Sequence, residues 1–171
     1  MFKKDTDTIL SQRQRRIYDF LQYHPTGVLT TVDPNGDPHG VVIYYTINKE
    51  FNVSFLTKTE TKKYDNLMRN GHVMLVVFDQ ASQTVAQVIG KALEITDNYD
   101  ANVVAAEILK ISQKTSKGGT PPISKLHTGG YTAFKIVPDQ IRIAFYDKSG
   151  SGNYSDIFES IESFVLKDED R

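Results

Sequence analysis

Two adjacent lysines at the start of a short helix are the residues whose type and spacing point most directly to chemistry. The segment of residues 57–79, TKTETKKYDNLMRNGHVMLVVFD, predicts a strand end, a helix and an apolar strand. Thr59 or Thr61 can cap this helix, which places Lys62 and Lys63 in its first turn. The helix dipole makes that end positive, so each lysine costs about 0.3–1 kcal/mol there. Backbone N–H groups, hydroxyls and two ammonium groups therefore predict an anion site, most naturally for phosphate.

The alternative interpretation of the lysine pair is that both side chains only point into solvent. Lysines are common on short surface helices, and exposed charges need no further explanation. The order of the elements that follow in the chain favours the anion site over this alternative.

Other kinds of site find less support in the composition. The chain has no cysteine, which excludes disulfides, thiolate catalysis and thiolate metal ligands. His24, His72 and His127 are scattered without the spacing of metal ligands, so we expect no metal site.

Length and charge are typical of a globular protein of one domain, which we expect to span residues 1–171. A chain of 171 residues can bury about 70% of its unfolded surface and needs no disulfide to fold. The formal net charge of -1 argues against a partner such as nucleic acid or an anionic membrane. We find neither a run of about 18 apolar residues nor a signal-peptide pattern. A soluble cytoplasmic protein is therefore expected.

Periodicity and turn residues predict the helices that surround the lysine pair. Apolar residues at helical spacing predict an N-terminal helix at residues 10–24, a helical insertion at 98–114 and a C-terminal helix at 154–166. Asn70-Gly71 predicts a left-handed end for the helix that carries the lysines.

Apolar segments bounded by turn residues predict the strands. They are residues 27–32, 39–47, 51–57, 72–79, 84–96, 131–137 and 140–147. Asp33-Pro34-Asn35-Gly36 predicts a β-hairpin turn, and we interpret Pro138-Asp139 as the turn of the last hairpin. Short turns between most strands predict a mainly β fold with flanking helices, an antiparallel barrel over about residues 27–147.

The order of these motifs resembles the FMN-binding split-barrel family of pyridoxamine 5'-phosphate oxidase and its relatives. In that family a strand ending in threonine precedes Ser/Thr, a basic residue and Lys, then a helix with an Asn-Leu pair and an apolar strand. The corresponding residues here are Thr57, Thr61-Lys62-Lys63, Asn66-Leu67 and 73–77. The family's V-x-G-x-A strand corresponds to 87–92, QVIGKA, and 136–145 is similar to its last strands.

The resemblance implies a six- to seven-stranded antiparallel split β-barrel. It implies a homodimer with FMN at the subunit interface, whose phosphate is held by Thr57, Thr61 and the two lysines. The strand of residues 39–44 would lie along the isoalloxazine ring, where Gly40 permits close approach. The expected cofactor-binding residues are His39, Gly40, Val41, Val42, Leu56, Thr57, Thr61, Lys62, Lys63 and Gln87.

Departures from the family pattern bear on the substrate. Members that act on pyridoxamine phosphate usually carry an arginine where this chain has His39 and a glutamine where it has Val85. Gln87 follows on the same strand face and can substitute. Their C-terminal segment carries a tryptophan, which this chain lacks. We therefore expect an FMN-dependent oxidoreductase for another small-molecule substrate, with redox chemistry from the cofactor and no assigned catalytic residue.

Three alternatives stay open at this point. One is a flavin-binding or flavin-sensing protein without turnover. Another is a split barrel that binds deazaflavin, heme or a tetrapyrrole; heme would favour an axial histidine and make His39 or His127 its test. The last is a barrel with an interaction role, in which the lysines are only surface charges.

Overall fold

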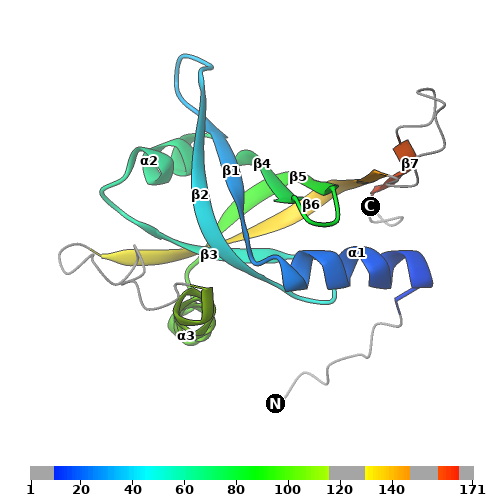
Figure 1. Ribbon diagram of the computed structural model, residues 1–171. Helices are drawn as coiled ribbons and strands as arrows, with labels where there is room; N and C mark the ends of the chain where they lie inside the picture. Colours follow the sequence, from blue (N-terminus) through cyan, green and yellow to red (C-terminus); the bar gives the residue numbers. More distant parts are fainter. Residues whose placement is uncertain (1–9, 116–129, 147–157, 166–171) are drawn as a thin grey trace, which may run out of the picture.

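The computed structural model describes residues 10–115, 130–146 and 158–165 (Figure 1). The described part of the chain contains three helices and seven strands. The helices are α1 (Gln12–Tyr23), α2 (Lys62–Arg69) and α3 (Asn98–Thr115). The strands are β1 (Thr26–Val32), β2 (Pro38–Ile47), β3 (Val53–Lys58), β4 (His72–Asp79), β5 (Thr84–Ile95), β6 (Tyr131–Tyr146) and β7 (Phe158–Val165).

Six antiparallel strands close into a barrel, which confirms the fold class expected from the sequence. The strands follow the order β3-β2-β1-β4-β5-β6, and β6 pairs back with β3. Residues 131–136 of β6 pair with β3, whereas its second half from Gln140 pairs with β7. Strand β7 therefore extends the sheet beyond the closed barrel (Figure 1).

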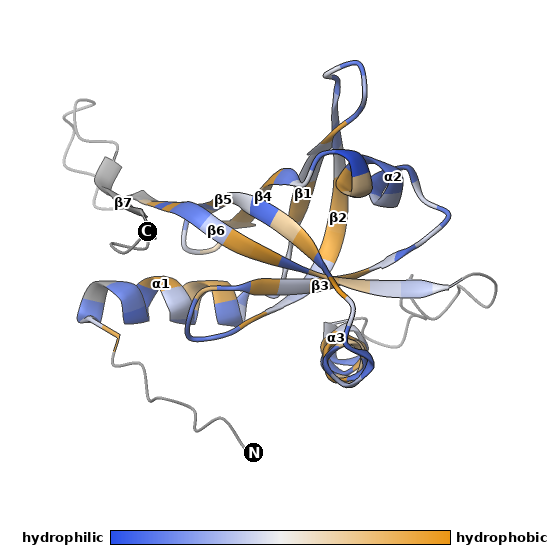
Figure 2. Ribbon diagram, turned by 180° about the vertical axis from the view of Figure 1, so that it is seen from behind, coloured by the Kyte–Doolittle hydropathy of each residue, from blue (hydrophilic) through white to orange (hydrophobic). Residues whose placement is uncertain are grey.

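The inward-facing side chains of the strands form the core. Burial alternates along strands β1 to β5 because successive side chains point to opposite faces. Fully buried large side chains of the barrel are Leu29, Tyr45, Phe55, Leu75, Phe134, Ile136, Ile141 and Ile143. Figure 2 shows the hydrophobic residues concentrated on these strands. On the outer face, Val28 and Val42 remain 42% and 69% exposed.

The three helices cover different parts of the barrel. Helix α1 buries Leu21, whose carbonyl oxygen accepts a 2.8 Å hydrogen bond from the Tyr45 hydroxyl. Helix α2 packs against β1 and β3 and buries Leu67. Helix α3 lies outside the barrel, on β2, β3 and β6, and buries Val104 and Ile108.

Local turn chemistry forms the β1–β2 hairpin as predicted. Gly36 has a φ of 89°, and its N–H donates to the carbonyl oxygen of Asp33 at 3.0 Å. The carboxylate of Asp33 accepts hydrogen bonds from the backbone N–H groups of Asn35 and Asp37, at 2.9 and 3.0 Å.

The predicted hairpin at Pro138-Asp139 is wrong, because β6 runs through these residues as one strand. The register between β5 and β6 shifts there, from Ile89↔Gln140 to Gly90↔Pro138. Asp139 is therefore the extra residue of a β-bulge. Pro138 is tolerated beside it because a residue at a bulge need not donate a hydrogen bond to the neighbouring strand. A Cβ on Gly90 would lie 2.2 Å from the Val137 carbonyl oxygen, so the bulge requires glycine.

Two predicted helical features also differ from the structure. Residues 158–165 of the predicted C-terminal helix at 154–166 form strand β7, and the rest of that segment lies outside the described residues. The second half of β6 extends past β3, and its open edge pairs with this segment. Helix α2 ends at Asn70 in extended backbone, without a left-handed residue. Gly71 instead lets the chain pass close to the Ala92 carbonyl oxygen, 2.8 Å from where a Cβ would stand.

Candidate functional site

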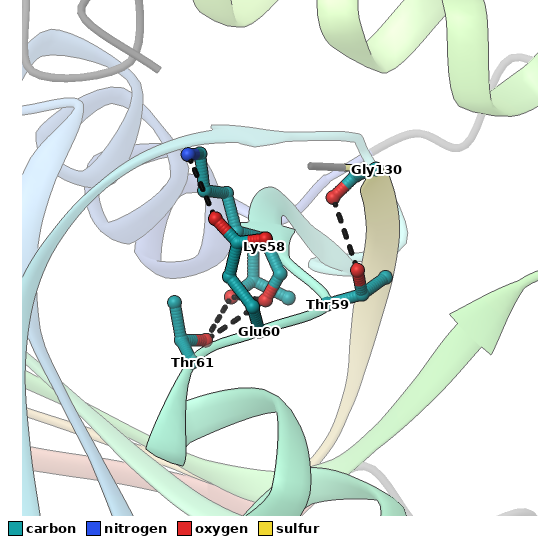
Figure 3. Close-up of polar contacts among 6 residues, drawn as sticks. Lys58, Thr59, Glu60, Thr61 and Gly130 are labelled. Carbon is teal, nitrogen blue, oxygen red and sulfur yellow. Dashed lines mark hydrogen bonds and ion pairs between the residues drawn. The ribbon is translucent and has the colours of Figure 1, made fainter. Parts of the chain in front are cut away.

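The turn between β3 and α2 holds its hydroxyl groups in a fixed arrangement. Thr61 is the N-cap of α2: its Oγ1 accepts a hydrogen bond from the Tyr64 N–H at 3.2 Å. The same hydroxyl lies 3.1 Å from Oγ1 of Thr57 and donates to the Lys58 carbonyl oxygen at 2.9 Å (Figure 3). Thr59, the other predicted cap, bonds instead to the Gly130 carbonyl oxygen, next to β6. Two hydroxyls therefore meet at the N-terminus of α2.

The two adjacent lysines take different directions from the start of α2. The Nζ of Lys62 lies 3.4 Å from Oδ2 of Asp33 in the β1–β2 turn, and its side chain is 58% exposed. The pKa of the Asp33 carboxyl is lowered, chiefly by the backbone N–H of Asp37 and in addition by Lys62. Lys62 therefore already has an anionic neighbour outside the barrel.

Lys63 turns toward the barrel and loses much of its contact with water. Its Nζ lies 5.7 Å from the ring centroid of Phe55, a fully buried core residue. Burial lowers the pKa of Lys63 to about 8. An ammonium group in such surroundings is stabilised by any anion that reaches it, because little solvent competes for the charge.

A cavity of about 280 Å³ lies beside Lys63, between the barrel wall and α3. Its lining residues are Val42, Ile43, Tyr44, Leu56, Thr57, Lys58, Thr61, Lys63, Ile108 and Tyr131. Five of the expected cofactor-binding residues meet here: Val42, Leu56, Thr57, Thr61 and Lys63. Cations and hydroxyls at one end and apolar walls elsewhere suit a ligand that joins an anionic group to an apolar body.

The other expected site residues lie elsewhere in the described part of the chain. His39, Gly40 and Val41 belong to β2 but do not line this cavity. His39 faces Thr31 across the strand pair, and its Nδ1 is buried with no hydrogen-bond partner among the described residues. Thr31 accepts a 3.0 Å hydrogen bond from the buried Asn66 of α2, which ties the helix to the barrel.

Gln87 is separated from the cavity by most of the outer sheet face. The register runs from Val42 to Val28, then to Val76 and to Gln87, one strand at a time. Three strand spacings correspond to about 14 Å. Within one chain, Gln87 and the lysine end of the cavity therefore do not meet.

Lys58 also lines the cavity, although it was not among the cofactor-binding residues expected from the sequence. Its side chain is only 8% exposed, and its Nζ lies 3.0 Å from Oε1 of Glu60 (Figure 3). Strand alternation puts Lys58 on the same face as Leu56, so its direction could have been found from the sequence. That α3 covers this face through Ile108 is visible only in the folded chain.

A larger cavity of about 480 Å³ lies between α1, β2 and α3. None of the expected cofactor-binding residues lines it, and it is distant in sequence from the N-terminus of α2. The described residues contain no group of three or more histidines and carboxylates that could hold a metal ion. Of the helices in the described ranges, none has the length and apolar character that a membrane crossing requires.

Comparison with protein families supports the architecture described above. A family model for pyridoxamine 5'-phosphate oxidase matches residues 14–144. No curated protein matches the chain.

Solved structures share the fold at low sequence identity. A putative pyridoxamine 5'-phosphate oxidase from Listeria innocua is 24% identical, with a TM-score of 0.60 over 77% of this chain and 98% of its own. A pyridoxamine 5'-phosphate oxidase-related, FMN binding protein from Nostoc punctiforme is 13% identical, with a TM-score of 0.56 over 94% and 100%. A heme binding protein from Mycobacterium smegmatis is 10% identical, with a TM-score of 0.65 over 92% and 60%. At these identities the likenesses show the fold alone.

Proposed function

The chain belongs to the pyridoxamine 5'-phosphate oxidase family, and on that basis we propose that it binds FMN and acts as an FMN-dependent oxidoreductase. The observation that carries the proposal is the desolvated ammonium of Lys63, which shares a cavity with Thr57, Thr61 and the N-terminus of α2. This donor set fits a phosphate, because it combines a cation, two hydroxyls and the N–H groups at a helix N-terminus.

The roles of the binding residues follow from their positions. Lys63 supplies the charge for the phosphate, and Thr57 and Thr61 supply hydroxyls that now bond to each other. Lys62 stands at the rim, where Asp33 already offsets its charge. The outer face of β2, with Gly40 and the exposed Val42, offers a flat wall for the ring system. FMN supplies the redox chemistry when bound, and the chain binds, orients and shields it.

We also propose that a homodimer completes the site. Val28 and Val42 leave apolar surface open on the outer face of the barrel, and Gln87 lies in the same row of that face. An isologous dimer through this face would bury the apolar surface and bring Gln87 of one subunit toward the cavity of the other. Within one chain Gln87 lies about 14 Å from Val42 in the cavity wall, so the dimer would add a contact that one subunit lacks.

Within this family fold, the lining of the cavity favours FMN over heme. Heme binding usually rests on an axial histidine, and the ten described residues that line the cavity include none. His127, one of the two histidines that heme binding would implicate, lies outside the described residues. Deazaflavin carries a phosphate too, so the ligand class is FMN or a phosphate-bearing analogue. A substrate other than pyridoxamine phosphate is proposed because His39 stands where an arginine is usual.

The first test is the visible absorption spectrum of freshly purified protein, followed by release of the ligand and its identification by mass. FMN at about one molecule per chain supports the proposal, since the site described holds one phosphate. Protein that arrives colourless is titrated with FMN and with riboflavin, which lacks the phosphate. Failure to bind FMN in both experiments refutes the proposal. Stopped-flow oxidation of the reduced flavin by candidate acceptors then separates an oxidoreductase from a protein that only binds flavin.

A further inference from the structure

Two lysines, Lys58 and Lys63, line the cavity, and different groups lie next to their ammonium groups. Lys63 lies over the Phe55 ring, whereas Lys58 lies 3.0 Å from the carboxylate of Glu60. Lys58 is 8% exposed, and Glu60 is 54% exposed. Figure 3 shows the ion pair between the two side chains, so one partner of the buried Lys58 is a carboxylate that is half in solvent.

Burial explains why Lys58 needs a counterion. Taking an ammonium group out of water costs several kcal/mol unless a nearby charge or hydrogen bond compensates. Glu60 contributes to this compensation from the short turn that joins β3 to α2. Because half of the Glu60 side chain remains in solvent, its carboxylate can return to water at little cost.

The backbone of this turn is held independently of the ion pair. The Thr59 N–H donates to the Gly130 carbonyl oxygen at 3.1 Å, and Thr61 caps α2. Glu60 can therefore leave Lys58 by side-chain rotation alone, without moving the hydroxyls of the site.

We propose that Glu60 is an internal counterion that holds Lys58 in the ligand-free protein and competes for it with the anionic group of the ligand. The proposal rests on the function proposed above, in which that group is the phosphate of FMN. On binding, Lys58 becomes a second ammonium partner of the phosphate beside Lys63, and the Glu60 carboxylate moves into solvent. Glu60 thus lowers the affinity for a phosphorylated flavin and leaves the affinity for an uncharged flavin unchanged.

The test compares FMN with riboflavin in the full chain, using quenching of flavin fluorescence to measure Kd. Glu60→Gln removes the competing charge and is expected to tighten FMN binding about threefold to fivefold, the worth of a half-exposed ion pair. Riboflavin binding should not change. The matched control is Glu50→Gln, which removes an exposed carboxylate from the β2–β3 turn, at the opposite end of β3. Lys58→Met should weaken FMN binding. In the double variant that carries both Lys58→Met and Glu60→Gln, the second substitution should no longer tighten FMN binding.

The outcomes separate this inference from the function on which it rests. Wild-type protein that binds no FMN refutes the proposed function and the inference with it. Wild-type protein that binds FMN, with an affinity that Glu60→Gln leaves unchanged or weakens, refutes the inference alone. An equal gain in Glu50→Gln also refutes it, because the effect would then come from net charge. Circular dichroism melts of each variant verify that the chain is folded.

Discussion

Replacing Lys63 by methionine should make the ligand-free protein more stable and remove most of its affinity for FMN. Burial lowers the pKa of Lys63 from 10.5 to about 8. The folded chain therefore holds this proton less tightly than the unfolded chain does, and at neutral pH the charged lysine opposes folding. At about 1.4 kcal/mol per pKa unit, the shift corresponds to a destabilisation of the folded chain by roughly 3 kcal/mol. Because Lys63 is partly exposed, solvent screening reduces this destabilisation to about 1–2 kcal/mol.

Two further contributions affect the size of this gain. Methionine keeps most of the apolar contact of the lysine stem, so little packing is lost. The variant also loses the interaction of the ammonium with the Phe55 ring, at 5.7 Å. This loss reduces the gain in stability by about 0.5 kcal/mol. The net expectation is a gain of about 1 kcal/mol in the free energy of unfolding, or about 2–4 °C in Tm for a domain of this size.

The loss of affinity should be larger and should separate the two lysines. A charge-assisted hydrogen bond to phosphate contributes about 1.5–3 kcal/mol, which corresponds to roughly 10- to 100-fold in Kd. Lys62→Met is the matched control, since it removes the same charge from the next residue. Lys62 is 58% exposed and paired with Asp33, so its loss should raise Kd by less than about fivefold.

The assay combines thermal melts of ligand-free protein with FMN titrations followed by flavin fluorescence. Lys63→Met is expected to raise the stability of the ligand-free protein and to lower its affinity for FMN. A variant that binds FMN like the wild type, or that melts at a lower temperature, would contradict this expectation. A greater loss of affinity in Lys62→Met than in Lys63→Met would show that the phosphate lies at the rim of the cavity instead.

Three further predictions follow from the same structure. FMN affinity should fall as the pH rises above about 8, because Lys63 then loses its proton. The ligand-free protein should become more stable between about pH 8 and 10.5, because the pKa of Lys63 is lower in the folded chain and the unfolded chain holds more protons in this range. FMN titrations and thermal melts across this pH range measure the two effects. Gly90→Ala should destabilise the fold by about 2–4 kcal/mol, because its Cβ would lie 2.2 Å from the Val137 carbonyl oxygen; denaturant unfolding measures the change, and a wild-type midpoint would disprove the close approach. Val28→Glu places a charge on the open outer face, where the side chain is 42% exposed, so light scattering should find a monomer with weakened FMN binding, and an unchanged dimer would place the interface elsewhere.

Much of the fold could be predicted because it depends on neighbouring residues. The apolar run after Gly71 forms β4 over the predicted residues 72–79. The β1–β2 turn forms because Gly36 accepts a positive φ and the Asp33 carboxylate caps two N–H groups. These preferences act within a few residues, so the sequence pattern contains them.

The predictions that were wrong concern segments whose secondary structure depends on residues far along the chain. Pro138-Asp139 has the composition of a turn, yet Gly90 on the neighbouring strand accommodates it as a bulge in β6. Residues 158–165 have helical spacing, yet they form β7 because β6 extends beyond the edge covered by β3. Pairing partners far along the chain supply hydrogen bonds that local propensity does not include.

By itself, the sequence determined that a threonine-capped helix would place two lysines after β3. It left open which lysine faces a ligand, because adjacent helix residues point about 100° apart and either could face inward. Packing of α2 through Leu67 and Asn66 turned Lys63 to the cavity and Lys62 to Asp33. Closure of β6 on β3, with α3 laid over both, then added Lys58 and Ile108 to the same walls. The tertiary structure decided these contacts because each joins elements that are neighbours only in the folded barrel.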